Sequence, residues 1–120
     1  MDEEVWRDIP GFEGAYQVSD FGRVRGLDRT VHHQGGHRFV RGRILRSRFS
    51  PNGGHHQVVL GYGTKGGKHI NARVHALVLL AFVGPRPEGL EIRHLNGTPS
   101  DNRLTNLEYA TKPPNRLDIK

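Results

Sequence analysis

Residues 89–115, GLEIRHLNGTPSDNRLTNLEYATKPPN, decide the fold of this 120-residue chain. A short apolar run ends at His94, and the loop that follows is rich in Gly, Asn, Asp and Ser, which predicts a strand and then a turn. A second strand-like run covers residues 106–110. Pro113 and Pro114 then suit the first turn of a helix, where their missing N–H groups cost little. The expected order is strand, loop, strand, helix, with imidazole and amide groups gathered on one small unit.

The bulk composition is that of a small basic protein with a modest core. Hydrophobic residues make up 34% of the chain, mean hydropathy is -0.63, and the length suits about one domain. The absence of cysteine excludes a disulfide scaffold and a thiolate zinc site. No apolar run approaches the ~20 residues of a membrane span and no signal peptide opens the chain, so we expect a cytoplasmic protein without a membrane partner.

The net charge of +6 is unevenly distributed. Residues 1–20 hold six acids and one base, whereas residues 23–48 hold eight arginines and a single acid, Asp28. Guanidinium groups pair bidentately with phosphate and with guanine edges. A solvated basic face is the simpler explanation, but the density of arginine favours a polyanion, and we expect double-stranded DNA as the partner.

Two hairpins and one helix are expected before the deciding segment. Residues 16–19 and 23–25 alternate like the strands of a short hairpin, and residues 57–62 and 69–74 read as a second one. Residues 74–83 are apolar almost throughout and predict a helix that ends before Gly84 and Pro85.

Two stretches that contain histidine are interpreted first as structural elements. The segment 32–37, HHQGGH, has no spacing that fixes a metal site and reads as a flexible hairpin loop. His75, at the start of the expected helix, reads as a capping or core histidine or as a second-shell partner of a metal site.

The segment 74–111, VHALVLLAFVGPRPEGLEIRHLNGTPSDNRLTNLEYAT, resembles the HNH endonucleases of phages and mobile introns, whose nuclease unit is the ββα-metal or His-Me finger. Residues 5–27, VWRDIPGFEGAYQVSDFGRVRGL, resemble the NUMOD4-type module often found in front of HNH nucleases. The resemblance implies an α+β fold with a β-rich DNA-contacting module at 1–50. An HNH nuclease domain at 51–120 would follow, with its ββα-metal core at about 89–120.

The resemblance also implies a set of site residues. His94 matches the general base, and Asn106 matches the central asparagine, whose amide can fix the loop and hold the imidazole in one tautomer. Asn115 matches a ligand of a divalent metal, Mg²⁺ or Mn²⁺, for which an amide oxygen is a suitable hard donor. Asn102 reads as a turn residue. The expected DNA contacts are made by arginines: Arg23, Arg25, Arg41, Arg43 and Arg103.

Arg93 departs from the family pattern, because many members have a metal-binding Asp or Asn directly before the base histidine. Three interpretations stay open. Arg93 acts in catalysis by binding the scissile phosphate, or another acid replaces the missing metal ligand, or the site is degenerate and the protein binds DNA without cutting it. The candidate replacement acids are Asp118, Asp101 and Glu91.

These features predict a metal-dependent DNA endonuclease that nicks or cuts a duplex with a histidine base. The first alternative is a non-catalytic or degenerate DNA-binding accessory protein, and the second is a structural domain whose histidines pack or face water. A phage origin would place the protein in the host cytoplasm. A homodimer and a phage-encoded protein partner are both compatible with the sequence.

Overall fold

Within the part of the chain that the structure describes, short antiparallel strands surround a single α-helix. The computed structural model describes residues 3–49, 54–64 and 66–111. The elements within these ranges are β1 (Trp6–Asp8), β2 (Tyr16–Ser19), β3 (Val24–Gly26), β4 (Arg29–His33), β5 (Gly36–Val40), β6 (Arg48–Phe49), β7 (His56–Gly61), β8 (His69–Arg73), α1 (Val74–Phe82), β9 (Leu90–His94), the 3-10 helix η1 (Leu104–Asn106) and β10 (Leu107–Thr111).

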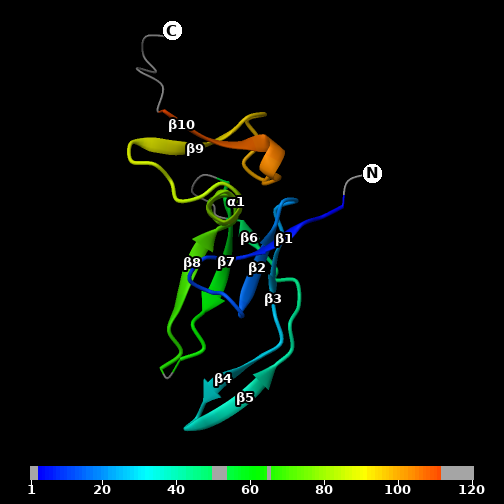
Figure 1. Cartoon of the computed structure of the whole chain (residues 1–120), viewed down its shortest axis with the longest axis vertical. Helices are drawn as coiled ribbons and strands as arrows, with labels where there is room; N and C mark the ends of the chain where they lie inside the picture. Colours follow the sequence, from blue (N-terminus) through cyan, green and yellow to red (C-terminus); the bar gives the residue numbers. More distant parts are fainter. Residues whose placement is uncertain (1–2, 50–53, 65, 112–120) are drawn as a thin grey trace.

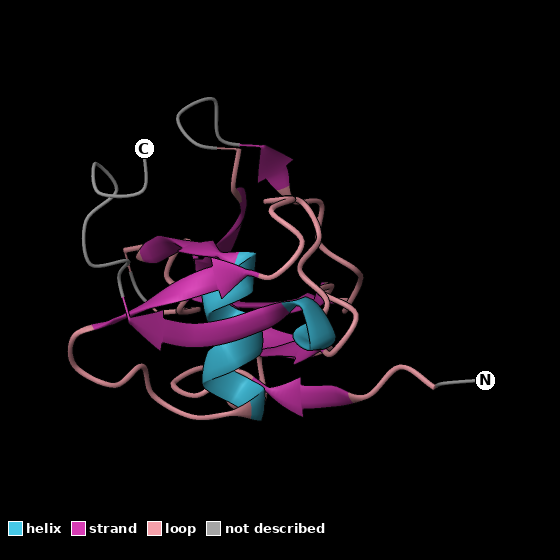
Figure 2. Ribbon diagram, turned by 90° about the horizontal axis from the view of Figure 1, so that it is seen from above, coloured by secondary structure: helices cyan, strands magenta, loops and turns pink. Residues whose placement is uncertain are grey.

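The strands form four small antiparallel sheets. Strands β1, β2 and β3 make one sheet and β6, β7 and β8 another, while β4 pairs with β5 and β9 pairs with β10. In Figure 1 the helix α1 lies between the β9–β10 hairpin on one side and the two three-stranded sheets on the other. Figure 2, seen from above, shows α1 in the middle of the molecule with strands around it.

The expected helix and hairpins are present, and the α+β fold class is confirmed. The helix forms because eight apolar or small residues and His75 follow one another without Gly or Pro, and it ends before the left-handed Gly84 (φ 135°). No helix in the described ranges has the length and apolarity needed to cross a membrane. The helix expected from Pro113 onward lies outside the described residues.

The buried core draws on both halves of the chain. Ile9, Val18 and Val24 come from the first fifty residues and pack in one cluster with residues of β7, α1 and β10, among them Leu60 and Val78. Because apolar burial is the main favourable term in folding, residues on both sides of position 50 stabilise one another. The two sequence modules therefore share one core, and the boundary between them at residue 50 stays a prediction.

The arginine- and histidine-rich stretch after β3 forms a paired ribbon. The prediction of a flexible loop at residues 32–37 is wrong in extent, because His32 pairs with His37 across β4 and β5. Gln34 (φ 48°) and Gly35 (φ 79°) supply the left-handed two-residue turn that a tight hairpin requires. The ribbon lies at the end of the molecule remote from the β9–β10 hairpin (Figure 1), and residues 29–40 contribute nothing to the buried cluster.

Candidate active site

The β9–β10 hairpin and its long connection carry the candidate site. His94 ends β9 and is paired with Leu107, the first residue of β10. The strand β9 alternates between half-buried and exposed residues, and His94 is on the half-buried side. Since side chains on a strand alternate between faces, His94 shares the face of Leu90 and Ile92, toward the interior.

Asn106 closes the connection between the two strands. Its Oδ1 accepts a hydrogen bond from the backbone N–H of Asn96 (3.0 Å), and its Nδ2 donates to Oδ1 of Asn96 (3.0 Å) and to the carbonyl oxygen of Asp101 (2.9 Å). The side chain is 6% exposed. The hydrogen bonds of Asn106 therefore fix the loop, as its match to the central asparagine implied, and the ring of His94 is held by a different amide.

Asn102 makes the hydrogen bond to His94. Nε2 of the ring lies 2.9 Å from Oδ1 of Asn102, which is 7% exposed. A carbonyl oxygen can only accept, so Nε2 carries the proton and donates it. In the neutral ring Nδ1 then has the free lone pair, the arrangement that a general base needs.

Two further imidazole rings pack against His94. The ring centroid of His75, from α1, is 5.3 Å from that of His94, and the centroid of His55 is 4.7 Å from His75 and 5.9 Å from His94. The His55 and His75 rings are nearly parallel, with an interplanar angle of 11°. We call His55, His75 and His94 the imidazole cluster; its members come from three separate parts of the chain.

The environment of His55 and His75 favours the neutral form of these two rings. Burial, followed by the positive charges of His55, His94 and Arg73, lowers the pKa of His75 from 6.5 to about 4. Burial also lowers the pKa of His55, with smaller contributions from Arg73 and His94. His75 is 6% exposed and is therefore an uncharged ring near neutral pH.

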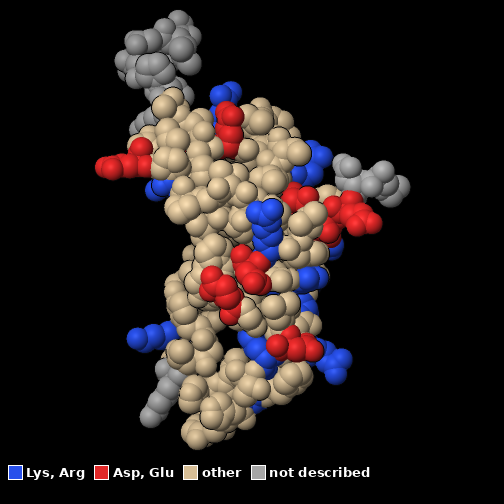
Figure 3. All heavy atoms as spheres, viewed as in Figure 1, with Lys and Arg blue, Asp and Glu red and all other residues tan. Residues whose placement is uncertain are grey.

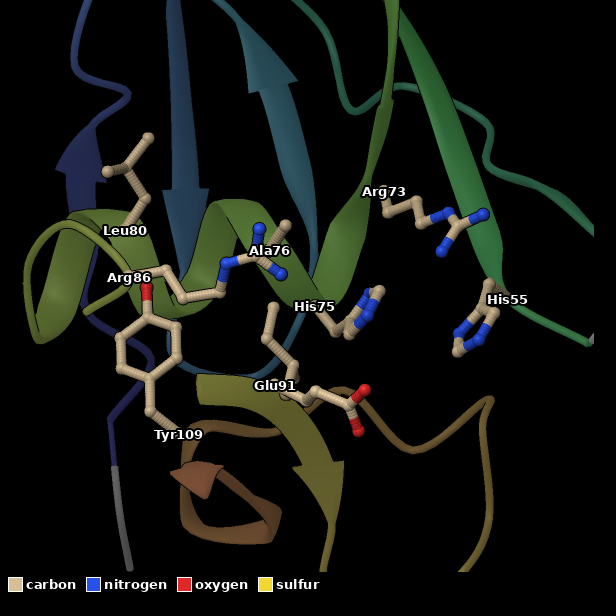
Figure 4. Close-up of a pocket in the computed structure, with 9 residues that line it drawn as sticks. His55, Arg73, His75, Ala76, Leu80, Arg86, Glu91 and Tyr109 are labelled. Atoms are coloured by element: carbon tan, nitrogen blue, oxygen red, sulfur yellow. The ribbon is translucent and has the colours of Figure 1, made fainter. Parts of the chain in front are cut away.

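An open cleft of about 620 Å³ lies beside the cluster. Its polar lining includes His55 and His75, together with Arg73, Arg86 and Glu91. Figure 4 shows the rings of His75 and His55 side by side, with the Glu91 carboxylate on the β9 side and the Arg73 guanidinium on the other. Charges of both signs therefore line the cleft beside His55 and His75.

Arg93 is on the face of β9 opposite to His94. It pairs across the hairpin with Glu108, with Nη1 3.7 Å from the carboxylate, and its side chain is 64% exposed. The structure therefore does not group Arg93 with the imidazole cluster. An exposed pair of this length contributes little to stability, so the guanidinium can exchange Glu108 for another anion.

The other predicted arginines fall into two groups. Arg23 directly precedes β3 and Arg25 lies on it, and both already have partners. Both guanidinium groups lie over the Trp6 ring. In addition, Arg23 pairs with Glu4, and Arg25 donates a hydrogen bond to Oε1 of Gln17.

Arg41 and Arg43 line a groove of about 590 Å³, together with Arg29 and Arg38. Arg103 forms a two-point pair with Asp101, both distances being 2.8 Å, and its hydrogen bonds hold the pKa of that carboxyl well below its usual range. The face shown in Figure 3 carries acidic side chains among its basic ones.

The predicted metal ligands cannot be placed, because Asn115 and Asp118 lie outside the described residues. Within the described ranges, no group of three or more His, Asp or Glu side chains is arranged to hold a metal ion. The described residues therefore do not make a metal site without further ligands.

Sequence reasoning missed two members of the site. His55 follows a Gly-rich turn and carries no local signal of function. Asn102 sits in a Ser-Asp-Asn stretch whose composition is typical of a turn, so its contact with His94 appears only once the loop folds back. His75 was expected in the core, and it is buried there; its stacking on His94 is the additional finding.

Comparisons with known proteins find relatives over most of the chain. Residues 4–61 match the NUMOD4 motif and residues 72–117 match the HNH endonuclease family. The chain is 35% identical over 112 residues to the DNA endonuclease I-HmuI of Bacillus phage SP01, an alignment that covers 92% of this chain and 54% of that protein. It is also 35% identical over 119 residues to an uncharacterized HNH endonuclease of Acanthamoeba polyphaga mimivirus, covering 93% of this chain and 25% of the relative.

A solved structure shares the fold. The structure that describes DNA binding and cleavage by the HNH homing endonuclease I-HmuI superposes with a TM-score of 0.70 at 31% identity, over 96% of this chain and 55% of that one. The chain thus spans about half the length of I-HmuI and a quarter of the mimivirus protein. By these matches, residues 72–117 are an HNH endonuclease segment, a NUMOD4 motif lies ahead of it, and the chain as a whole is similar to I-HmuI.

Proposed function

We propose that this protein is a DNA endonuclease that hydrolyses phosphodiester bonds with His94 as the general base. The observation that carries the proposal is the hydrogen bond from Nε2 of His94 to Asn102, which leaves Nδ1 free to take a proton. The relatives named endonuclease, and I-HmuI in particular, support DNA as the substrate.

Each of the residues His94, Asn102 and Asn106 has a role in the proposed hydrolysis. Nδ1 of His94 removes a proton from water, the water oxygen forms a bond to phosphorus, and the bond from phosphorus to the 3′ oxygen breaks with its electron pair. The 3′ oxygen takes a proton from solvent, so the products carry a 5′-phosphate and a 3′-hydroxyl. Asn106 contributes by keeping the loop in place and Asn102 by keeping the ring in one tautomer.

HNH endonucleases depend in general on a divalent metal, and we propose Mg²⁺ or Mn²⁺ here. Such an ion stabilises negative charge on the phosphate and on the leaving oxygen. We propose Asn115 as a ligand, with Asp118 as the acid that replaces the ligand lost at Arg93. Arg93 would then bind a phosphate of the substrate, exchanging its exposed contact with Glu108 for a DNA oxygen.

We propose that the arginine-rich first half binds the DNA backbone. Arg41 and Arg43 share a groove with two other arginines, which supports a phosphate track there. Arg23 and Arg25 are held over Trp6, so their guanidinium groups are ordered before DNA arrives. Arg103 lies in the same loop as Asn102, where it would contact the strand that is cut.

The test is cleavage of supercoiled plasmid with Mg²⁺, Mn²⁺ or EDTA by the wild type and by His94→Ala. Wild-type cleavage that needs the metal and is lost in His94→Ala is the expected result, with a loss of about 10²–10⁴-fold. His69→Ala, an exposed histidine on β8, is the matched control and should cut normally. Full activity in His94→Ala would overturn the assignment of the base.

The second candidate function is DNA binding without cleavage, which the position of Arg93 favours. A wild type that binds plasmid in a salt-dependent way but makes no breaks with either metal would establish this function instead. Arg93→Asp supplies a carboxylate at the same position, and a gain of cleavage in this variant would identify the missing metal ligand as the cause.

A further inference from the structure

A turn of the N-terminal β-sheet is packed directly against the loop that carries Asn102. The turn comprises residues 19–22, between β2 and β3. The backbone N–H of Leu104 donates to the carbonyl oxygen of Asp20 at 2.8 Å, which joins the turn to the start of η1. We call residues 19–22 the bracing turn.

The bracing turn is itself rigidly held. Oγ of Ser19, which is fully buried, accepts hydrogen bonds from the backbone N–H groups of Phe21 (3.2 Å) and Arg23 (3.1 Å). The N–H of Gly22 donates to the carbonyl oxygen of Ser19 at 3.0 Å, and Oδ1 of Asp20 accepts from the N–H of Val5 at 2.9 Å. Both ends of the turn are therefore tied to the first sheet.

Gly22 makes the closest contact with the site. Its φ is 91°, and a Cβ at this position would lie 2.8 Å from the backbone oxygen of Asn102, 2.9 Å from its carbonyl carbon and 3.0 Å from its Cβ. The two distances to the carbonyl group are below 3.0 Å, which real Cβ atoms essentially never show, and backbone atoms cannot rotate out of the way as a long side chain can. The backbone of Asn102 thus rests on Gly22.

Asn102 is also the residue that holds His94. We propose that the bracing turn positions the catalytic ring: the N-terminal motif, through Gly22 and Asp20, fixes the Asn102 amide and thereby the orientation and tautomer of His94. This inference rests on the proposed role of His94 as the base. It gives the NUMOD4 segment a part in catalysis in addition to the DNA contact proposed above.

The test compares Gly22→Ala with Gly14→Ala. Gly14 is in the same sheet module and has a similar left-handed φ of 83°, but no atom lies within 4 Å of a Cβ built on it. Both variants bear the backbone penalty of a non-glycine residue at positive φ. Only the new methyl group of Gly22→Ala clashes with Asn102. The difference between the two variants therefore measures the effect of the contact between Gly22 and Asn102.

Three measurements are made on each full-length variant: cleavage rate at saturating DNA, DNA affinity by filter binding, and the long-range ¹H–¹⁵N NMR signals of the His94 ring. In Gly22→Ala we expect the cleavage rate to fall by about 10- to 100-fold, as for a small misplacement of a reacting group. DNA affinity should match that of Gly14→Ala, and the ring should lose its uniform Nε2–H signature.

Equal rates and equal His94 spectra in the two variants would overturn the proposal. If the wild type cuts no DNA, the proposed function fails, yet the ring spectra still decide whether the turn positions His94. If Gly22→Ala does not fold, Ser19→Ala loosens the same turn without a clash. Ser19→Ala is expected to cost the His94 ring its uniform Nε2–H signature, as Gly22→Ala does. An unchanged spectrum would contradict the inference.

Discussion

The amide oxygen of Asn102 lies 2.9 Å from Nε2 of His94, so one side chain of the connecting loop determines which ring nitrogen is free to accept a proton. The ring is held from a second direction by stacking on His75. A general base works best when its lone pair already points at the water it activates, so under the proposed role of His94 both contacts bear on the cleavage rate.

Asn102→Ala is expected to lower the cleavage rate by about 10- to 100-fold while DNA affinity stays close to that of the wild type. The ring would lose its acceptor, and NMR would report a mixture of tautomers. Asn102→Asp keeps an oxygen in place and should restore the Nε2–H form. Its carboxylate favours the charged imidazolium, so the rising limb of the pH–rate profile should move to higher pH. An unshifted profile together with a mixed tautomer would contradict this account.

Asn106→Ala is expected to act chiefly on stability. The substitution removes three hydrogen bonds from a side chain that is 6% exposed and leaves loop groups without partners. A loss of roughly 2–4 kcal/mol in the free energy of unfolding is expected from such unpaired buried groups. Urea denaturation measures it, and Asn71→Ala, an exposed asparagine on β8, should change stability by less than about 0.5 kcal/mol. Equal losses in both variants would show that Asn106 does not hold the loop.

His75 makes stability depend on pH. Its pKa is lowered from 6.5 to about 4, so between these values the unfolded chain binds a proton that the folded protein does not. The stabilisation is fully present above pH 6.5 and is lost as the pH falls toward 4, with a total of roughly 2–3 kcal/mol.

His75→Phe keeps a flat ring in the cluster and cannot titrate. Thermal or urea unfolding of this variant between pH 6.5 and 5 should show a flatter dependence than the wild type, the remaining slope coming partly from His55. The window above pH 5 keeps most carboxylates out of the comparison. A slope as steep as that of the wild type would rule out His75 as its source.

The groove arginines should set the salt dependence of DNA binding. Replacing Arg41 and Arg43 together by glutamine is expected to weaken binding and to reduce the slope of log affinity against log salt by about 2, because each lost phosphate contact contributes about 0.9. The cleavage rate at saturating DNA should be unchanged. Arg23→Gln is the comparison, and since Arg23 is already paired with Glu4 its effect on the slope should be smaller. A slope that no variant changes would place the phosphate contacts elsewhere.

Local patterns predicted the elements well, because each depends on residues close in sequence. The apolar run of α1 and the alternation in β2, β3, β7 and β8 all appear where expected. The fold class followed from the family resemblance. The tight β4–β5 pairing was missed because a segment rich in Gly and His has the composition of a loop. In the structure only Gln34 and Gly35 form the turn, and the residues on either side of them are paired.

The site was harder to predict, because its contacts join distant parts of the chain. His94 was predicted from the resemblance, but the ring that stacks on it comes from α1 and the next ring from a loop before β7. The contact between Gly22 and Asn102 spans eighty positions and depends on the packing of two sheets around one helix. Such relationships are set by tertiary packing, which composition and periodicity do not encode.

The β4–β5 ribbon contributes no side chain to the buried cluster. Substitutions at its exposed positions therefore leave the free energy of folding almost untouched, in contrast to changes in the neighbouring sheets and at Arg29, which donates a hydrogen bond to the core residue Tyr16. A segment that contributes so little to stability can accumulate substitutions quickly. Because Arg38 of the ribbon lines the groove proposed to bind DNA, this freedom offers a route by which the DNA contacts change while the residues of the β9–β10 hairpin stay the same.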